Sequence, residues 1–199
     1  MKKTDNLRYL EKLVKFSHLF NQVQRKVIVN GGDRLENDSE HSFQLAFISW
    51  CIIDSQKLKL DVNKVIKYAL VHDLVEVYAG DTFFYNKNPN FKNIKKQKEK
   101  DSLAKIKKQF PEIKMITKLI EEYEKLDCEE AKFVYALDKI LVVINIYLDN
   151  GRSWKAHKVN IKMLLSKKEK VALSPVVNNY WQEILDYLKR NEEKFFDEK

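Results

Sequence analysis

The sequence is poor in the residues that make tight turns and cross-links. Its 199 residues include only four glycines, three prolines and two cysteines. β-Sandwiches, β-barrels and glycine-rich nucleotide-binding folds need many turn residues, so this composition argues against all three. Cys51 and Cys128 lie far apart and form no CxxC motif, so we expect two reduced, buried thiols and no disulfide framework.

Long apolar runs and arginine are also scarce. No stretch reaches the 18 apolar residues typical of a membrane helix, and the N-terminus lacks the apolar core of a signal peptide. We therefore expect a cytoplasmic protein without membrane contact.

Only five of the 37 basic residues are arginines, and lysine and glutamate alternate along most of the chain, although the run 92–108 holds eight lysines. This pattern is typical of solvated helix surfaces, so no stable nucleic-acid partner is expected.

The remaining composition is that of a globular helical protein. Hydrophobic residues make up 44% of the chain, and the net charge is +8. Apolar spacing predicts an all-α fold, a compact bundle of six or seven helices within a single domain, residues 1–199. Helical patterns cover 5–22, 38–55, 61–80, 91–109, 112–125, 128–149 and 174–196, with a weaker one over 156–170 and the least helical stretch at 23–38.

A few ionisable residues interrupt apolar helix faces. His72, Asp73 and Glu76 stand within the apolar segment 69–79, and their spacing lets all three point toward one region. Asp138 lies in the middle of the most apolar helix, and His41 precedes another apolar run. Lys139 points about 100° away from Asp138 around the helix, so we expect the partner of Asp138 on another helix. Buried carboxylates are costly without a compensating cation.

Two histidines and two aspartates form a plausible single-ion site: His41, His72, Asp73 and Asp138. Imidazole and carboxylate ligands suit one divalent ion such as Mn²⁺, Fe²⁺, Co²⁺, Ni²⁺, Zn²⁺ or Mg²⁺. Taken singly, each residue fits equally well as a hydrogen-bonded core histidine or as a capping or ion-paired aspartate. Such a metal centre is nearly neutral, so a bound phosphate would need further cations, for which Arg25, Arg34 and Lys139 are the candidates and the 92–108 lysines weaker ones.

These residues carry a resemblance to the HD-domain metallophosphohydrolases, whose signature is H…HD…D. Segments 34–42 (RLENDSEHS), 70–81 (LVHDLVEVYAGD) and 129–139 (EEAKFVYALDK) resemble the 5′-deoxynucleotidase branch of that family. The resemblance covers about residues 8–150, which would form the metal-site core, with the C-terminal helices of about 156–197 packed on it.

The resemblance implies an all-α homodimer that hydrolyses deoxyribonucleoside 5′-monophosphates. It assigns the metal to His41, His72, Asp73 and Asp138, catalysis to Glu76, nucleotide contact to Asp81 and phosphate contact to Arg25. The chain departs from the bacterial pattern at Lys26, where those enzymes carry a tryptophan that helps to select deoxyribose. The sugar preference is therefore open.

Several alternatives remain at this stage. An HD-type pyrophosphohydrolase or phosphodiesterase acting on another nucleotide is one, and a non-catalytic nucleotide- or metal-binding protein is a second. Residues outside the candidate site receive ordinary roles: Trp50 and Trp181 on core faces, His157 on the surface, and 151–154 as a packing corner. The aromatic cluster Phe83-Phe84-Tyr85 is a candidate core or dimer contact.

Overall fold

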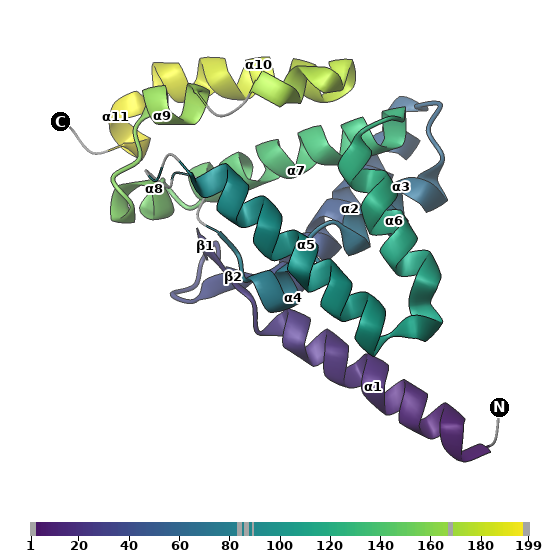
Figure 1. Ribbon diagram of the computed structural model, residues 1–199. Helices are drawn as coiled ribbons and strands as arrows, with labels where there is room; N and C mark the ends of the chain where they lie inside the picture. The colour runs from purple at the N-terminus through teal and green to yellow at the C-terminus, as the bar shows by residue number, and fades with distance from the viewer. Residues whose placement is uncertain (1–2, 83–84, 86–87, 89, 167–168, 197–199) are drawn as a thin grey trace.

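The computed structural model describes residues 3–82, 85, 88, 90–166 and 169–196. These residues form eleven α-helices, two short 3₁₀ helices and one antiparallel hairpin (Figure 1). The all-α prediction is confirmed. The helices outnumber the six or seven expected because four of them have only four or five residues. Phe83 and Phe84 lie outside the described residues.

The N-terminal elements place the hairpin beside the start of a long helix. α1 (Lys3–Asn21) leads into β1 (Gln24–Ile28) and β2 (Leu35–Asn37), within the stretch predicted to be least helical. α2 (Asp38–Gln56) follows directly. Its first turn is fixed by a capping box, in which Asn37 accepts the Glu40 N–H and the Glu40 carboxylate accepts the Asn37 N–H.

The segment predicted as one helix over 61–80 is two helices separated by a turn. α3 (Val62–Val71) begins after Asp61, whose side chain caps the Lys64 N–H, and ends at His72. α4 (Glu76–Ala79) starts after the turn and stops at Gly80, which has a φ of +74°. The apolar pattern runs unbroken through the turn because both helices pack on the same interior, so the pattern alone conceals the break.

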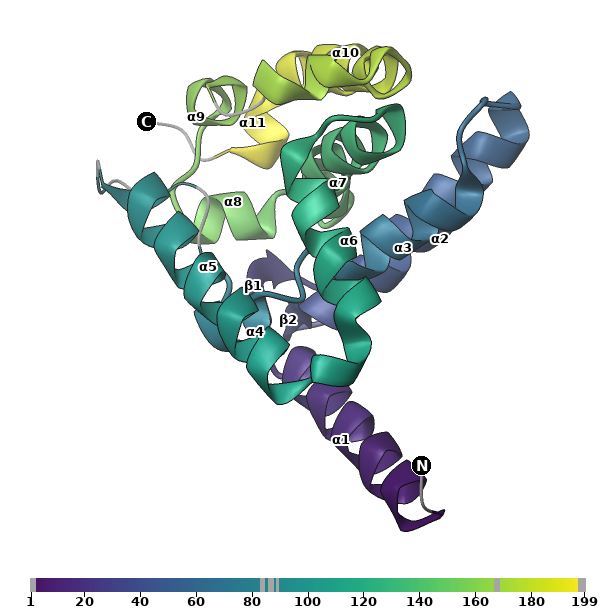
Figure 2. The same cartoon turned by 45° about the vertical axis from the view of Figure 1, so that its right-hand side comes forward.

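α7 (Glu129–Leu148) is the central helix. It contacts α2, α3, β1, α6 (Lys114–Lys125) and α10 (Pro175–Arg190). Figure 2 shows α10 lying over α7, while α1 extends away on the opposite side of the molecule. Half of the residues of α7 are buried, which explains its apolar sequence, and Asp138 is among the buried ones.

The remaining elements close the two sides of α7. On one side α6 packs on α7, and α5 (Phe91–Gln109) and a 3₁₀ helix (Pro111–Ile113) pack on α6. α8 (Arg152–Ala156), α9 (Ile161–Leu165), a second 3₁₀ helix (Glu169–Leu173) and α11 (Glu192–Phe195) cover the other. Gly151 joins α7 to α8 with a φ of +75°, and a Cβ there would overlap the Phe195 carbonyl. The C-terminus is therefore packed tightly against this corner.

The expectations for two tryptophans and two cysteines have different outcomes. Trp181 is buried, as predicted, but Trp50 is 54% exposed on α2, which corrects its assignment to the core. Cys51 is also exposed rather than buried, while Cys128 is partly buried, and both are free thiols. Trp50 and Cys51 lie on the outer side of α2, and the apolar character of this helix all round hid which side faces the core.

Candidate functional site

Four side chains predicted as metal ligands meet at the centre of the molecule. His41 comes from the first turn of α2, His72 from the end of α3, Asp73 from the turn after it and Asp138 from the middle of α7. His41 Nε2 lies 2.9 Å from Asp138 Oδ1, and His72 Nε2 lies 2.9 Å from Asp73 Oδ2 and 3.9 Å from Asp138 Oδ1. The fold thus joins residues separated by up to 97 positions.

The orientation of both imidazoles fits a bound cation. His72 Nδ1 donates to the Ala69 carbonyl at 2.8 Å, so the Nε2 lone pair of the neutral ring points toward Asp73 Oδ2, 2.9 Å away, an arrangement that suits two ligands of one cation. Burial, and then nearby Arg25, lower the pKa of His41 to about 4, so His41 is neutral at pH 7. Ligand atoms of His41, His72 and Asp73 all lie within 4.8 Å of one another. This donor set fits one divalent ion.

Arg25 on β1 is surrounded by carboxylates beside this cluster. Its Nη1 lies 2.8 Å from Asp73 Oδ2 and 3.3 Å from Asp38 Oδ1, and its Nε lies 3.2 Å from Glu36 Oε2. Burial raises the pKa of both Glu36 and Asp38 to about 7. The structure therefore brings the predicted Arg25 to the site, and it adds two acidic neighbours that the sequence interpretation missed.

A second acidic group lies next to Asp73. Carboxylate oxygens of Asp38, Asp73 and Glu76 also lie within 4.8 Å of one another. Cations from the protein already pair with this group, because Arg25 contacts both aspartates and Lys95 Nζ lies 3.1 Å from Glu76 Oε1. The histidine-containing cluster differs from this group because it adds two imidazole nitrogens to its carboxylate oxygen.

Glu76 combines deep burial with one unpaired oxygen. Its residue surface is 3% exposed, and Oε2 has no hydrogen-bond partner among the described residues. Burial, and then the charge of Asp73, raise the pKa of Glu76 well above its usual value. Asp81 lines the same pocket, and burial raises its pKa as well. These two carboxyl groups hold protons more readily than exposed ones.

The other predicted cations are placed differently. Lys139 Nζ lies 2.6 Å from Asp138 Oδ2, so its flexible side chain bends back to the neighbour from which it was expected to point away. Arg34 does not line the pocket: its side chain is 60% exposed, and it pairs with Glu40. Lys95, from the lysine-rich run, supplies a pocket cation instead.

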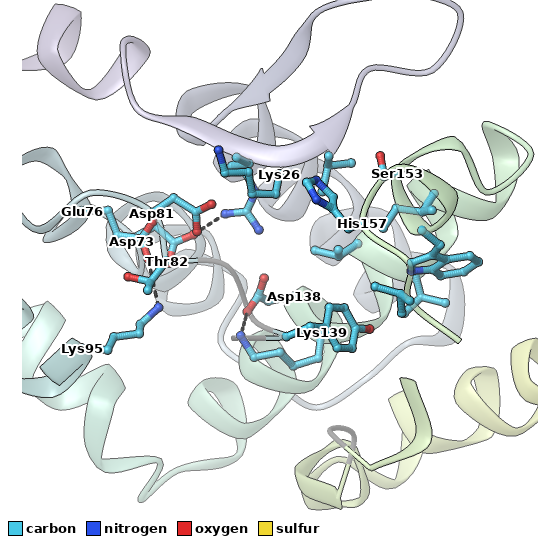
Figure 3. A pocket seen from close by; sticks show the side chains of 18 residues that line it. Lys26, Asp73, Glu76, Asp81, Thr82, Lys95, Asp138, Lys139, Ser153 and His157 are labelled. Atoms are coloured by element: carbon cyan, nitrogen blue, oxygen red, sulfur yellow. Dashed lines mark hydrogen bonds and ion pairs between the residues drawn. The ribbon is translucent and has the colours of Figure 1, made fainter. Parts of the chain in front are cut away.

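Asp73, Asp138 and the basic and acidic side chains beside them line one end of a pocket of about 840 Å³, which includes some open solvent, whereas His41 and His72 are not among the described residues that line it. Figure 3 shows Glu76, Asp73, Asp81 and Lys95 on one side, with Asp138 and Lys139 between them and the side formed by Ser153 and His157. The second end is apolar, and its wall is made by Val142, Val143, Ile146, Trp154 and Val159. The segment 151–154, predicted as a packing corner, thus also forms part of the pocket wall through Ser153 and Trp154. No feature of its sequence indicated this second role.

The arrangement can accommodate an elongated anion. The candidate metal ligands Asp73 and Asp138 and three basic side chains gather at one end, next to a carboxyl group that can carry a proton. The apolar end suits a flat or aliphatic group attached to that anion.

Comparisons with known proteins agree with this geometry. The chain is 30% identical to the 5′-deoxynucleotidase HDDC2 of Mus musculus over 138 residues, which is 66% of this chain and 67% of that protein. It is 34% identical to the Dictyostelium discoideum protein of the same name over 128 residues, 60% of this chain and 66% of that one. The matched segment thus spans about two thirds of these relatives.

Solved structures share the fold. A predicted metal-dependent phosphohydrolase from Magnetospirillum magnetotacticum superposes with a TM-score of 0.78 at 23% identity, covering 91% of both chains. A protein from Pyrococcus horikoshii gives a TM-score of 0.61 at 24% identity, covering 91% of this chain and 98% of that one. The sequence profile described as HD domain matches residues 20–178. Because this match covers most of the chain and includes all four candidate ligands, the chain belongs to the HD-domain family.

Proposed function

We propose that this protein is a metal-dependent phosphohydrolase that removes the 5′-phosphate from nucleoside or deoxynucleoside monophosphates. The observation that carries the proposal is the pocket end where Asp73 and Asp138, each 2.9 Å from one of the two buried histidines His72 and His41, meet three basic side chains and a buried glutamate. The relatives named 5′-deoxynucleotidase support the choice of a nucleotide substrate.

The site residues divide into an ion-binding set and a phosphate-binding set. The two histidines and two aspartates would hold one divalent ion, which supplies a Lewis acid for phosphate oxygens and activates water. The two ligand carboxylates offset the charge of that ion, so a phosphate dianion needs additional cations. Arg25, Lys95 and Lys139 line the pocket at the required place. Arg34 has no part in this set, because it is paired with Glu40 outside the pocket.

Glu76 would serve as the proton donor. The departing nucleoside oxygen is a poor leaving group unless it gains a proton, and a buried carboxyl group with a raised pKa holds one near neutrality. Asp81 would accept a hydrogen bond from a sugar hydroxyl, because it lines the pocket on the same side and its residue is only partly exposed. Lys26, which also lines the pocket, stands in place of the tryptophan of the bacterial pattern.

We further propose a homodimer formed through the outer faces of α1 and α2. Phe43, Phe47 and Trp50 on α2 are 68%, 50% and 54% exposed, and the rings of Phe43 and Phe47 stack with centroids 6.2 Å apart. Leu10 and Val14 on the neighbouring α1 are also exposed. Large apolar side chains exposed on two helices that contact each other indicate an interface, and a second copy of the chain brings identical side chains to cover them.

The single-domain organisation and the cytoplasmic localisation are two further proposals. We treat residues 1–199 as one domain because the main apolar core joins residues from Val27 to Phe196. Cytoplasmic localisation stays a prediction of the sequence. Within the described part of the chain, no helix is long and apolar enough to cross a membrane.

Phosphate release from a panel of ribo- and deoxynucleoside mono-, di- and triphosphates tests the proposal. Metal-stripped protein is resupplied with Mn²⁺, Co²⁺, Ni²⁺, Zn²⁺, Fe²⁺ or Mg²⁺. We expect release from monophosphates that is restored by an added ion. Release of pyrophosphate from triphosphates would favour the pyrophosphohydrolase alternative, and binding without cleavage under every ion would favour the sensing alternative.

A further inference from the structure

The apolar end of the pocket contains an unpaired hydrogen-bond donor. Trp154 on α8 is 1% exposed and lines the pocket, and its Nε1–H has no acceptor among the described residues. Buried polar groups in native proteins nearly always have a partner, so an isolated donor at a pocket wall indicates a ligand acceptor. The proposed phosphate chemistry does not use this group.

The position of Trp154 relative to the metal cluster suits the far edge of a nucleotide. Asp138, Val142 and Ile146 follow one another at four-residue spacing along α7, and all three line the pocket. Eight residues of α-helix span about 12 Å, which is comparable to the length of a nucleoside monophosphate. With the phosphate at Asp138, the base therefore reaches the Ile146 end, where the Gly151 N–H donates to the Ile146 carbonyl and Gly151 leads into α8, which carries Trp154.

The indole is held in place by the C-terminal segment. Phe196 stacks on Trp154 with ring centroids 4.9 Å apart and an interplanar angle of 18°, and Phe195 meets it edge-on at 6.5 Å. The close approach of Gly151 to the Phe195 backbone fixes the same corner. The Nε1–H is thus preorganised and cannot easily turn to another acceptor.

The other polar groups at this end also favour acceptors on the ligand. Ser153 and His157 are the polar side chains on this side of the pocket (Figure 3), and among the described lining residues this end has no carboxylate or amide side chain to receive an amino group. Ser153 Oγ already accepts the Ile28 N–H at 2.8 Å, which leaves its own hydroxyl hydrogen for donation. An exocyclic amino group placed here would meet a donor in Trp154, whereas a carbonyl oxygen would be satisfied.

We propose that Trp154 is a specificity-determining residue that donates a hydrogen bond to a carbonyl oxygen on the base edge farthest from the sugar. Thymine, uracil and guanine carry a carbonyl oxygen there, while cytosine and adenine carry an amino group. The pocket therefore favours bases that carry a carbonyl oxygen at this edge over bases that carry an amino group there. The valines of α7 pack on the ring of the base. This inference rests on the proposed nucleotide substrate.

The substrates dUMP and dCMP differ chiefly at this position, so their kcat/KM ratio is the measurement. We expect wild-type protein to favour dUMP by on the order of ten-fold, the usual effect of one buried hydrogen bond. Trp154→Phe keeps an aromatic ring but removes the donor, and it should bring the ratio close to one by raising KM for dUMP. Trp181→Phe is the matched control, because Trp181 is equally a buried tryptophan but does not line the pocket. It should leave the ratio unchanged.

A ratio near one in wild-type protein overturns the inference, whether or not Trp154→Phe folds. An unchanged ratio in folded Trp154→Phe does the same. Val142→Phe gives a second test, because it fills the apolar end: dUMP hydrolysis should fall, while hydrolysis of the base-free deoxyribose 5-phosphate should persist. Equal loss of both substrates in folded protein contradicts a base site.

Calorimetric binding of dUMP and dCMP separates this inference from the proposed function. If neither nucleotide is hydrolysed but dUMP binds more tightly in a Trp154-dependent way, the hydrolase proposal fails and the base preference stands. If both are hydrolysed and bound equally, the hydrolase proposal stands and the base preference fails.

Discussion

Replacing Arg25 with methionine separates the pocket arginine from the exposed one. The Arg25 side chain is 11% exposed and contacts carboxylates of Glu36, Asp38 and Asp73. Methionine keeps much of the apolar stem but leaves these buried acids without their cation. Removing one partner of a buried ion pair costs about 3–5 kcal/mol, so we expect a loss of unfolding free energy of this order in metal-free protein. An added divalent ion should restore part of it, since ligand binding stabilises the folded state.

The same variant should be impaired in catalysis. Loss of one preorganised charge at a reacting oxyanion reduces kcat by about 10²–10³. Arg25→Lys should recover little, because an ammonium cannot reproduce the planar fork that reaches several carboxylates at once. Phosphate release from dUMP and urea unfolding with and without metal provide the two readouts.

Arg34→Met is the matched control. Arg34 belongs to the same hairpin region and is also paired with a glutamate, but it is exposed and does not line the pocket. We expect activity and stability close to those of the wild type. Equal losses of activity in the two variants, or an active Arg25→Met protein, would refute the assignment of phosphate binding to Arg25.

Three further predictions concern single positions. Glu76→Gln should keep the bound ion and the fold but lower kcat by about 10²–10⁴, as expected for loss of a general acid; unchanged kcat would remove Glu76 from proton transfer. Lys95→Met should raise KM for nucleotide, whereas Lys100→Met, on the exposed side of α5, should not, and a comparable rise in both would make the effect one of general charge. Phe47→Glu should convert a dimer to a monomer in analytical ultracentrifugation, while an unchanged sedimentation coefficient would place the interface elsewhere.

The clustering of the four candidate ligands was predictable because each of them disrupts a simple pattern. Asp138 and His72 stand on apolar helix faces, where burying an ionisable residue is costly and therefore indicates a bound or paired charge. Such signals are local, so they can be recognised in the sequence without knowledge of the fold. The resemblance of segments 34–42, 70–81 and 129–139 to a known family then connected residues that the sequence keeps far apart.

Four residues of the site were not identified from the sequence, because no local sequence pattern marks them. Asp38 reads as an ordinary helix-start residue, and Glu36 lies in a polar stretch, yet the hairpin buries both against Arg25. Lys95 is one lysine among eight, and only the position of α5 shows that it faces Glu76. Trp154 becomes a pocket wall because the C-terminal segment returns to pack behind it. These placements depend on tertiary contacts between distant segments.

Metal stoichiometry tests the central claim most directly. Wild-type protein, Asp138→Ala and the surface control Asp101→Ala are dialysed against a fixed concentration of the activating ion, and bound metal is measured by elemental analysis together with phosphate release. We predict one ion per chain in the wild type and the control, and loss of both ion and activity in folded Asp138→Ala. An Asp138→Ala protein that keeps its ion and its activity would contradict the assignment of the catalytic metal to His41, His72, Asp73 and Asp138.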